Sequence, residues 1–316
     1  MSRHDKSSTW IEQERAKAFP GDVQTSALEI DADNEIGRGQ ARPANARPST
    51  PAASPAIAES DSSVVPLTVE NLQVRCPRLE WTPDPRALLT IASEGIGRGA
   101  EEFRSLRSFL YLVREQRRLR RLLISSSLPG EGKTFTALNL AHAMACQPEH
   151  CALLIDGDLR LPKLHTALGT SCAPGLSDYL TGQADEFSIL QRSSLENLFF
   201  IPAGRPAPNP SELIGNGRLK LLLDRLSPAI DWIIMDSPPV IPVSDAKLLA
   251  EVCDAVLLVV RAGVTPYDLA QKACRQFRNE QLLAAVLNRA APNQAYASYY
   301  PYNRGVGSGN GKRPKR

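Results

Sequence analysis

Short apolar runs alternate with longer stretches of helical period from about residue 120 onward. Apolar runs bounded by turn residues are typical of buried strands, and apolar positions three or four apart are typical of helices. Apolar strands separated by helices predict an α/β fold, a mostly parallel sheet covered by helices on both faces. The predicted strands are Leu122–Ser126, Ala152–Asp156, Leu198–Pro202, Trp232–Asp236, Ala255–Arg261 and Leu283–Asn288. The predicted helices are Thr134–Cys146, Gly175–Leu180, Ser211–Leu226, Ser244–Val252 and Pro266–Arg278.

The two ends of the chain lack this pattern. Residues 1–83 have no sustained hydrophobic period and are rich in Ala, Pro and Ser, so we expect a largely disordered leader. A short helix around Trp10–Lys17 and an edge element within Val64–Trp81 are the exceptions that its composition allows. We expect the folded domain at residues 84–290 and a flexible, basic, tyrosine-rich tail at 291–316.

Composition excludes several classes of protein. A formal charge of +3 is too small to indicate nucleic acid as a partner. The six cysteines form no Cys-x-x-Cys pair, which favours reduced thiols in a cytosolic protein over disulfides or a zinc site. No run of 18 apolar residues is present, so no membrane-spanning helix is expected, and a membrane role requires a partner.

A glycine-containing loop joins the first predicted strand to the helix that follows it. The loop ends in Gly132, Lys133 and Thr134. In a loop between a strand and a helix, the backbone N–H groups and Lys133 can bind a phosphate, and the Thr134 hydroxyl can bind Mg²⁺. An ordinary turn is the alternative, which the flanking strand and helix disfavour. The expected nucleotide-binding residues are Ser127, Pro129, Gly130, Glu131, Gly132, Lys133, Thr134 and Phe135, with Ser127 standing where the phosphate-loop pattern has its first glycine.

Carboxylates follow two other predicted strands. Asp156 and Asp158 come at the end of one strand and Asp236 at the end of another. Ligands bind at the carboxyl ends of an open parallel sheet, so these acids should lie near the phosphate loop. Asp236 suits a Walker-B role at Mg²⁺, while one of Asp156 and Asp158 assists the metal and the other accepts a proton from a hydroxyl. Helix capping is the alternative, which three acids beside one such loop disfavour.

Charged residues also mark the predicted helix over residues 101–112. Glu101, Arg104 and Arg107 lie about one turn apart on one side of it, where they can pair with another subunit. A solvated helix face is the alternative, and it is the more common role of such patterns. The arginine-rich run over residues 114–121 indicates only a basic helix end before the first strand.

These segments together resemble the bacterial tyrosine autokinases, or BY-kinases, of capsule and exopolysaccharide biosynthesis. Residues 125–134 resemble their Walker A motif, residues 153–160 their Walker A′ motif and residues 233–239 their Walker B motif. The spacing of Glu101, Arg104 and Arg107 resembles the oligomerisation motif of the family, which favours the interfacial interpretation of that helix. The resemblance extends from about Asp84 to Asn303 and leaves the leader unexplained.

The resemblance implies an ATP- and Mg²⁺-dependent kinase that phosphorylates its own tail tyrosines, neighbour to neighbour, in a ring. Lys133 would act on the γ-phosphate, and Asp156 or Asp158 would deprotonate tyrosine. The implied partners are a membrane chain-length determinant protein of the Wzz type, which would hold the cytoplasmic kinase at the inner face of the membrane, and a cognate tyrosine phosphatase. The remaining implied roles are Mg²⁺ binding by Thr134, Asp156 and Asp236, and nucleotide contacts by Arg160 and Asn288.

The tail carries a cluster of tyrosines and an excess of positive charge. After Glu280 the only charged side chains are basic, and each phosphotyrosine adds about −1.5 to −2 charges. We therefore expect phosphorylation to cancel or invert the charge of the tail, expel it from a neighbour's acidic site and open the ring. An aromatic patch that packs on a partner is the alternative. The expected acceptors are Tyr296, Tyr299, Tyr300 and Tyr302.

Two rival functions share the same loop. A partitioning or septum-site ATPase is a switch without protein-kinase activity, and it carries a second lysine where this chain has Leu128. Such ATPases also lack a terminal tyrosine cluster. The other rival is a nucleotide-binding scaffold of a polysaccharide export complex, against which the intact lysine and acids argue.

Overall fold

A computed structural model describes residues 67–89, 98–147, 149–192 and 197–290. In these residues, seven strands form one sheet in the order β3-β4-β2-β5-β1-β6-β7. All neighbouring strands pair in parallel except the edge pair β3 and β4, which confirms the predicted fold class. The strands are β1 (Arg121–Ser126), β2 (Ala152–Asp156), β3 (Gln191–Arg192), β4 (Leu198–Ile201), β5 (Trp232–Asp236), β6 (Ala255–Arg261) and β7 (Leu282–Asn288).

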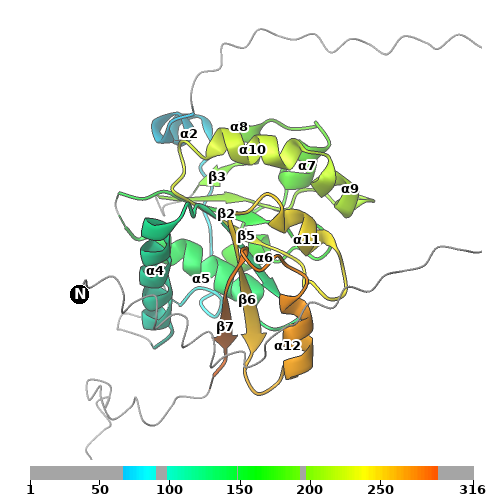
Figure 1. The fold of residues 1–316 in the computed structure, drawn as a ribbon. Coiled ribbons are helices and arrows are strands. Elements are labelled where there is room, and N and C mark those ends of the chain that lie inside the picture. The colour runs from blue at the N-terminus through cyan, green and yellow to red at the C-terminus, as the bar shows by residue number, and fades with distance from the viewer. Residues whose placement is uncertain (1–66, 90–97, 148, 193–196, 291–316) are drawn as a thin grey trace, which may run out of the picture. The chain divides into compact units, whose positions relative to one another are not determined.

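Helices cover both faces of the sheet (Figure 1). Successive side chains of a strand point to opposite faces, so Leu122 and Ile124 of β1 enter one apolar core and Leu123 the other. Burial on both faces explains why the central strands are continuously apolar. On the face of Leu122 lie α4 (Arg98–Gln116), α5 (Lys133–Ala145) and α6 (Leu164–Leu168). On the other lie α2 (Val69–Arg75), α7 (Leu176–Leu180), α8 (Glu186–Ile189), α9 (Pro210–Gly215), α10 (Arg218–Leu226), α11 (Asp245–Ala250) and α12 (Tyr267–Cys274).

The six predicted strands are confirmed to within one residue at each end. The single helix predicted over Ser211–Leu226 is wrong, because the chain breaks it into α9 and α10 at Gly217. Gly217 has a φ of +83°, a left-handed conformation that ends a right-handed helix. The short elements β3, α6 and α8 were not predicted, since a few residues do not establish a period.

Residues 67–89 form a strap that packs on this domain. Leu79 donates its backbone N–H to the Arg192 carbonyl at 2.8 Å, which extends the sheet beyond β3. The Trp81 ring then meets the Phe200 ring edge-on at 6.1 Å, and Leu88 is fully buried. The edge element expected within Val64–Trp81 is thus confirmed, and the folded unit includes residues that the sequence assigned to the leader.

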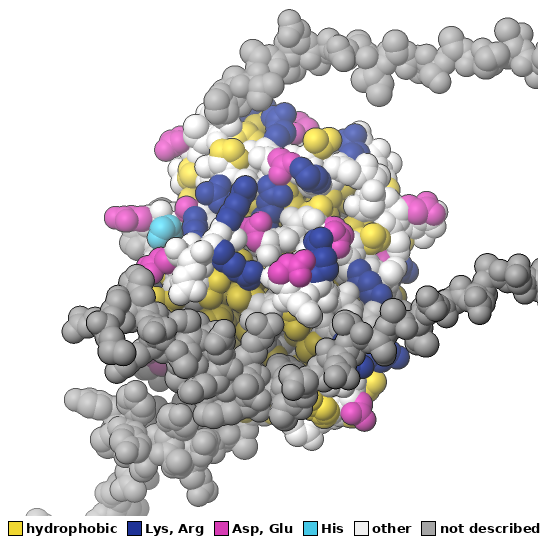
Figure 2. All heavy atoms as spheres, in the orientation of Figure 1, with side chains coloured by type: hydrophobic (Ala, Val, Ile, Leu, Met, Phe, Trp, Pro, Cys, Tyr) yellow, Lys and Arg dark blue, Asp and Glu magenta, His cyan; other side chains and the backbone are white. Residues whose placement is uncertain are grey.

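The arginine-rich run at the end of α4 is largely taken up by contacts within the domain. Arg121 is buried, and its guanidinium pairs with Asp224 at 2.6 Å and donates to the Ser227 hydroxyl. The Arg120 guanidinium donates to the Ser227 carbonyl, and that of Arg117 to the Glu280 carbonyl. Basic and acidic side chains are interspersed over the face seen in Figure 2. These arginines therefore connect α4 and β1 to the end of α10 and to the turn that precedes β7.

Several predictions fall on residues outside the described ranges. They are the leader up to residue 66, including the helix around Trp10–Lys17, and the tail with Tyr296, Tyr299, Tyr300 and Tyr302. All six cysteines lie within the described ranges and are free thiols. Among the helices of the described residues, none combines the length and the apolar character needed to cross a bilayer.

Candidate active site

The predicted acids meet at the carboxyl end of the sheet. Strand β5 lies between β1 and β2, and its last residue, Asp236, is in register with Asp156 on β2 and with Ile124 on β1. After Ser126 the chain leaves β1 and enters the phosphate loop, residues 127–132, which leads into α5. Three consecutive strands of the sheet thus deliver two carboxylates and the loop to one place.

Glycines set the path of the phosphate loop. Gly130 and Gly132 have φ values of +81° and +100°, which residues with a side chain rarely adopt. Gly132 directly precedes Lys133, the first residue of α5, so the loop brings backbone N–H groups to the N-terminus of a 13-residue helix. Ser127 is fully buried and its hydroxyl has no hydrogen-bond partner in the described chain, while Pro129 and Gly130 are exposed at the tip. This geometry suits a phosphate.

Glu131 holds the loop from within. Its carboxylate is 3% exposed and accepts hydrogen bonds from the Leu128 backbone N–H and from the Thr265 hydroxyl. Its backbone carbonyl accepts a bond of 2.9 Å from the Asn288 side chain at the end of β7. The ends of β6 and β7 are therefore tied to the phosphate loop. Sequence reasoning missed Thr265, whose partner lies 134 residues away.

Lys133 and Thr134 face the acids. The Lys133 ammonium lies 3.3 Å from an Asp158 oxygen and 4.0 Å from Asp236 Oδ1. The Thr134 hydroxyl donates to Asp236 Oδ2 at 2.7 Å. The four side chains that the sequence assigned to phosphate, metal and proton transfer are thus in mutual contact.

Asp156 caps a helix, which is the alternative that the sequence left open, and it also lies in the acidic cluster. Its Oδ2 atom accepts from the backbone N–H groups of Lys163 and Leu164, at 3.2 and 3.0 Å, which caps the start of α6. The same carboxylate is fully buried beside Asp236. The two Asp156 oxygens are engaged by backbone N–H groups, since Oδ1 accepts from Asp158 at 3.3 Å.

Negative charge exceeds positive charge in this cluster. Burial raises the pKa of the Asp156 carboxyl above its usual range, and the charges of Asp236 and Asp158 raise it further. Burial also raises the pKa of Asp236, although Lys133 and the Thr134 hydroxyl oppose that effect. Three carboxylates share one lysine, so a cation would relieve their repulsion.

The residues fit Mg²⁺. Asp236 Oδ1 is buried without a hydrogen-bond partner, and the Thr134 hydroxyl lies on the other oxygen of the same carboxylate. In the described residues no group of three or more His, Cys, Asp and Glu side chains has the arrangement of a metal cage. Mg²⁺ at a nucleotide requires no such cage, because it is held by one or two protein oxygens together with phosphates and water.

Arg160 is held by Asp245 and Ser211. Its guanidinium pairs with Asp245 through two hydrogen bonds of 2.6 and 3.0 Å and donates to the Ser211 hydroxyl at 3.0 Å. Asp245, at the start of α11, is fully buried. Sequence reasoning missed Asp245, because a Ser-Asp pair at a helix start indicates only a cap. The predicted contact of Arg160 with nucleotide stays a prediction.

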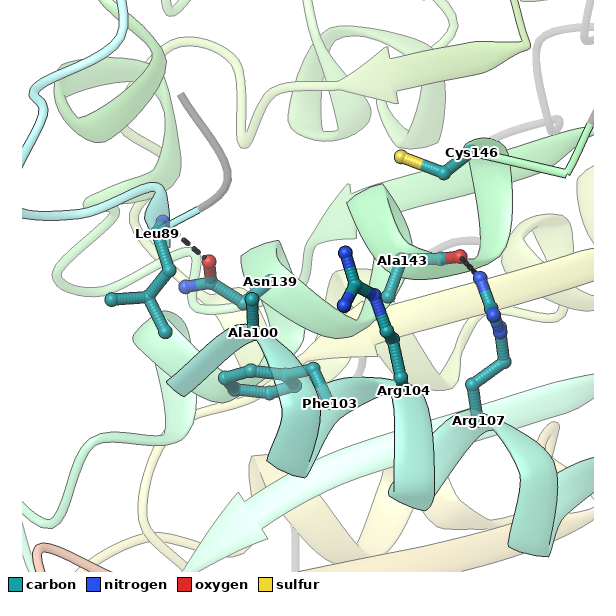
Figure 3. Close-up of a pocket in the computed structure, with 8 residues that line it drawn as sticks. All are labelled: Leu89, Ala100, Phe103, Arg104, Arg107, Asn139, Ala143 and Cys146. Atoms are coloured by element: carbon teal, nitrogen blue, oxygen red, sulfur yellow. Dashed lines mark hydrogen bonds between the residues drawn. The ribbon is translucent and has the colours of Figure 1, made fainter. Parts of the chain in front are cut away.

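The side chains expected at a subunit interface make contacts within the chain. Arg104 pairs with Glu101 at 3.0 Å, and both are about half-exposed on α4. Arg107 donates to the Ala143 carbonyl at 2.7 Å, near the end of α5, as Figure 3 shows. A small pocket between α4 and α5 is lined by both arginines. The role of this surface in oligomerisation stays a prediction.

Asn139 joins the strap to the helix of the phosphate loop. Its side-chain oxygen accepts from the Leu89 backbone N–H at 2.9 Å, as Figure 3 shows. Its side-chain nitrogen donates to the carbonyls of Ala87 and Phe135 at 2.8 Å. The Phe135 ring lies 5.9 Å from the Phe103 ring of α4. Phe135, expected at the nucleotide, therefore also packs between α5 and α4.

Comparisons with known proteins find related kinases. No protein-family model matches the chain. Over 191 residues the chain is 35% identical to the tyrosine-protein kinase YwqD of Bacillus subtilis, covering 60% of this chain and 80% of that kinase. Over 208 residues it is 34% identical to the tyrosine-protein kinase wzc of Salmonella typhimurium, covering 64% of this chain but only 29% of that longer protein.

A solved structure shows the same similarity. The kinase domain of the Escherichia coli tyrosine kinase ETK superposes with a TM-score of 0.55 at 30% sequence identity. The match covers 61% of this chain and 78% of the ETK domain. The shared sheet and the extent of the YwqD match lead to one conclusion. The chain belongs to the bacterial tyrosine-protein kinases.

Proposed function

We propose that this kinase uses ATP and Mg²⁺ to phosphorylate its own tail tyrosines, in trans, within a ring of identical subunits. The observation that carries the proposal is the convergence of Lys133, Asp158, Asp236 and Thr134 at the phosphate loop. Such a set supplies a cation for the transferred phosphoryl group, two oxygens for Mg²⁺ and a carboxylate for the acceptor hydroxyl.

Each side chain has a distinct role in this proposal. The Lys133 ammonium binds the γ-phosphate and stabilises the charge that it develops. Thr134 and Asp236 hold Mg²⁺, which neutralises phosphate charge when bound, and Asp156 adds negative charge beside them. Asn288, which touches the backbone of Glu131, lies on the side where we place the adenine.

We assign the deprotonation of the acceptor tyrosine to Asp158. Both oxygens of Asp156 accept from backbone N–H groups that fix the following turn, and the side chain is fully buried. One Asp158 oxygen faces Lys133, where the phosphoryl group would lie. Asp158→Asn should therefore abolish phosphotransfer and leave nucleotide binding in place, while Asp156→Asn should also weaken the Mg²⁺-dependent part of binding.

The reach of the tail is compatible with phosphorylation between neighbours. Tyr296 is the eighth residue after Asn288, a span of at most roughly 28 Å. A mixing experiment tests this directly: Lys133→Met with intact tyrosines is combined with active kinase whose four tail tyrosines are Phe. Anti-phosphotyrosine signal on the inactive chain supports transfer in trans. Signal from wild type alone but none from the mixture would contradict it.

Charge reversal in the tail provides the regulatory step. The unmodified basic tail docks at a neighbour's acidic site, and the phosphorylated tail is expelled, so the ring opens. Replacing all four tyrosines by Phe should keep the oligomer assembled in ATP, as followed by light scattering. Disassembly of this variant by ATP to the same extent as wild type would exclude the mechanism.

The biological setting proposed from the family resemblance is control of exopolysaccharide or capsule polymerisation and export. A membrane chain-length determinant protein of the Wzz type would recruit the kinase to the inner face of the membrane, and a cognate phosphatase would reset it. Anti-phosphotyrosine blots of wild type and Lys133→Met separate this proposal from its rivals. Signal in neither would favour a switch ATPase or a scaffold.

A further inference from the structure

A large apolar side chain lies in solvent beside the catalytic acids. Leu161, in the loop between β2 and α6, is 70% exposed. Its backbone N–H donates to Asp158 Oδ1 at 3.1 Å, while the other oxygen of Asp158 faces Lys133 at 3.3 Å. The Asp158 carboxylate therefore lies between the phosphate-binding lysine and this leucine.

The loop that carries Leu161 is fixed on both sides of it. Before it, Arg160 is held by two hydrogen bonds to the buried Asp245. After it, the backbone N–H groups of Lys163 and Leu164 bind the Asp156 carboxylate. A contact on such a preorganised loop binds a ligand without an ordering cost of its own.

Exposure alone does not distinguish this leucine. Single apolar side chains are common on protein surfaces, and Leu221 on α10 is 62% exposed. The two leucines differ in position: the Leu221 backbone N–H donates to the Gly217 carbonyl, whereas the Leu161 backbone N–H donates to Asp158, the group we assign to the acceptor hydroxyl. Leu221 therefore provides a matched control.

The order of the strands separates the two substrates of the reaction. Strand β7, which ends at Asn288, lies two places from β1 on one side, and β2, which leads to Leu161, lies two places from β1 on the other. If the nucleotide base binds on the Asn288 side, the tyrosine substrate that accepts the phosphate binds beside the loop after β2. A tyrosine whose phenol oxygen lies at Asp158 places its ring, not its backbone, beside the loop.

We propose that Leu161 is an acceptor-specificity residue, whose side chain packs on the ring of the substrate tyrosine while Asp158 binds the phenol. This inference rests on the proposed kinase activity. An apolar contact with the ring favours tyrosine over serine and threonine, because the side chains of serine and threonine are too short to contact the leucine while their hydroxyl lies at Asp158. The chemical class selected is a tyrosyl peptide with apolar or aromatic neighbours, such as the segment from Tyr299 to Tyr302.

The test is steady-state kinetics of the full chain with a synthetic peptide of residues 293–304 as acceptor. Leu161→Ala should raise the KM for the peptide roughly tenfold, the usual effect of losing a few methyl and methylene contacts. The KM for ATP, the affinity for a fluorescent ADP analogue and the melting temperature should remain at wild-type values. Leu161→Met should restore most of the peptide affinity, and Leu221→Ala should change nothing.

The failure of this inference is distinguishable from the failure of the proposed function. A wild type that transfers no phosphate to the peptide would remove the kinase proposal itself. An active wild type with the same peptide KM in Leu161→Ala would overturn only the role of Leu161. Parallel changes in the KM for ATP and for peptide would show a structural effect and would also overturn it. Leu161→Gln, which keeps the length but not the apolar contact, repeats the measurement should the alanine variant misfold.

Discussion

Because buried negative charge is in excess at this site, we predict that Asp236→Asn stabilises the nucleotide-free protein. Asp236 is 1% exposed, and its Oδ1 atom has Lys133 only at 4.0 Å and no hydrogen-bond partner in the described chain. Asparagine has the same shape and keeps an oxygen for the Thr134 hydroxyl. The substitution therefore removes an unfavourable charge beside Asp156 and retains the packing, so the nucleotide-free protein should become more stable.

The size of the effect follows from what buried charges cost. Burial raises the pKa of Asp236 from 3.8 to about 6, which corresponds to about 3 kcal/mol of unfavourable free energy in the charged form. For a domain of this size, each kcal/mol shifts the melting temperature by about 2–4 °C. We therefore expect Asp236→Asn to melt roughly 6–12 °C above wild type in the absence of nucleotide and Mg²⁺.

Thermal melts with and without Mg²⁺ and ADP provide the assay. A ligand present at a hundred times its Kd stabilises wild type by about 2.7 kcal/mol. In Asp236→Asn the part of this stabilisation that depends on Mg²⁺ should disappear, because Asp236 supplies an oxygen to the metal. Without ligand, the variant would thus melt at a higher temperature than wild type. Adding Mg²⁺ and ADP would raise its melting temperature by less than that of wild type.

Asp224→Asn is the control. Asp224 is half-exposed, and hydrogen bonds from Lys220 and Arg121 hold the pKa of its carboxyl below its usual value. Its removal should leave the melting temperature equal or lower and the Mg²⁺·ADP shift intact. A lower melting temperature for ligand-free Asp236→Asn, or a full Mg²⁺-dependent shift in it, would refute the charge argument.

Two further predictions concern the same site. A Cβ at Gly132 would lie 1.9 Å from the Asn288 side-chain nitrogen, and the φ of +100° is strained for a residue with a side chain. Gly132→Ala should therefore weaken nucleotide binding roughly tenfold or more in calorimetric titration. Gly215→Ala, which has open space around its Cβ, should bind nucleotide like wild type, and equal affinities of the two variants would contradict the prediction. Raised pKa values mean that the folded state keeps protons on Asp156 and Asp236 that the unfolded chain has lost. Ligand-free stability should therefore fall as pH rises from about 4 through the raised pKa values, as followed by melts across pH, and a stability that rises over this interval would contradict the assignment.

Local signals explain how much of this molecule could be predicted. The sheet and the phosphate loop could be predicted because each strand is a continuous apolar run and the loop is contiguous in sequence. The break at Gly217 also had a local signal, the Asn-Gly pair before α10, which the helical period of the surrounding leucines outweighed.

Contacts between distant residues account for what could not be predicted. Arg160 binds Asp245, 85 residues away, and Glu131 binds Thr265, 134 residues away. The strap likewise has no single period, because residues 67–76 pack on one face of a domain formed by later residues and residues 81–88 pack on the other. The sequence indicated the residues to which we assign the chemistry, but not the residues that hold them in place.

The central claim is that the phosphate loop transfers phosphate to tail tyrosines. Trypsin cleaves after Arg289 and Arg304, so one peptide contains Tyr296, Tyr299, Tyr300 and Tyr302. Mass spectrometry of this peptide, after incubation of the purified chain with ATP and Mg²⁺, should find phosphotyrosine in wild type and none in Lys133→Met. ATP hydrolysis by wild type with an unmodified peptide would contradict the claim.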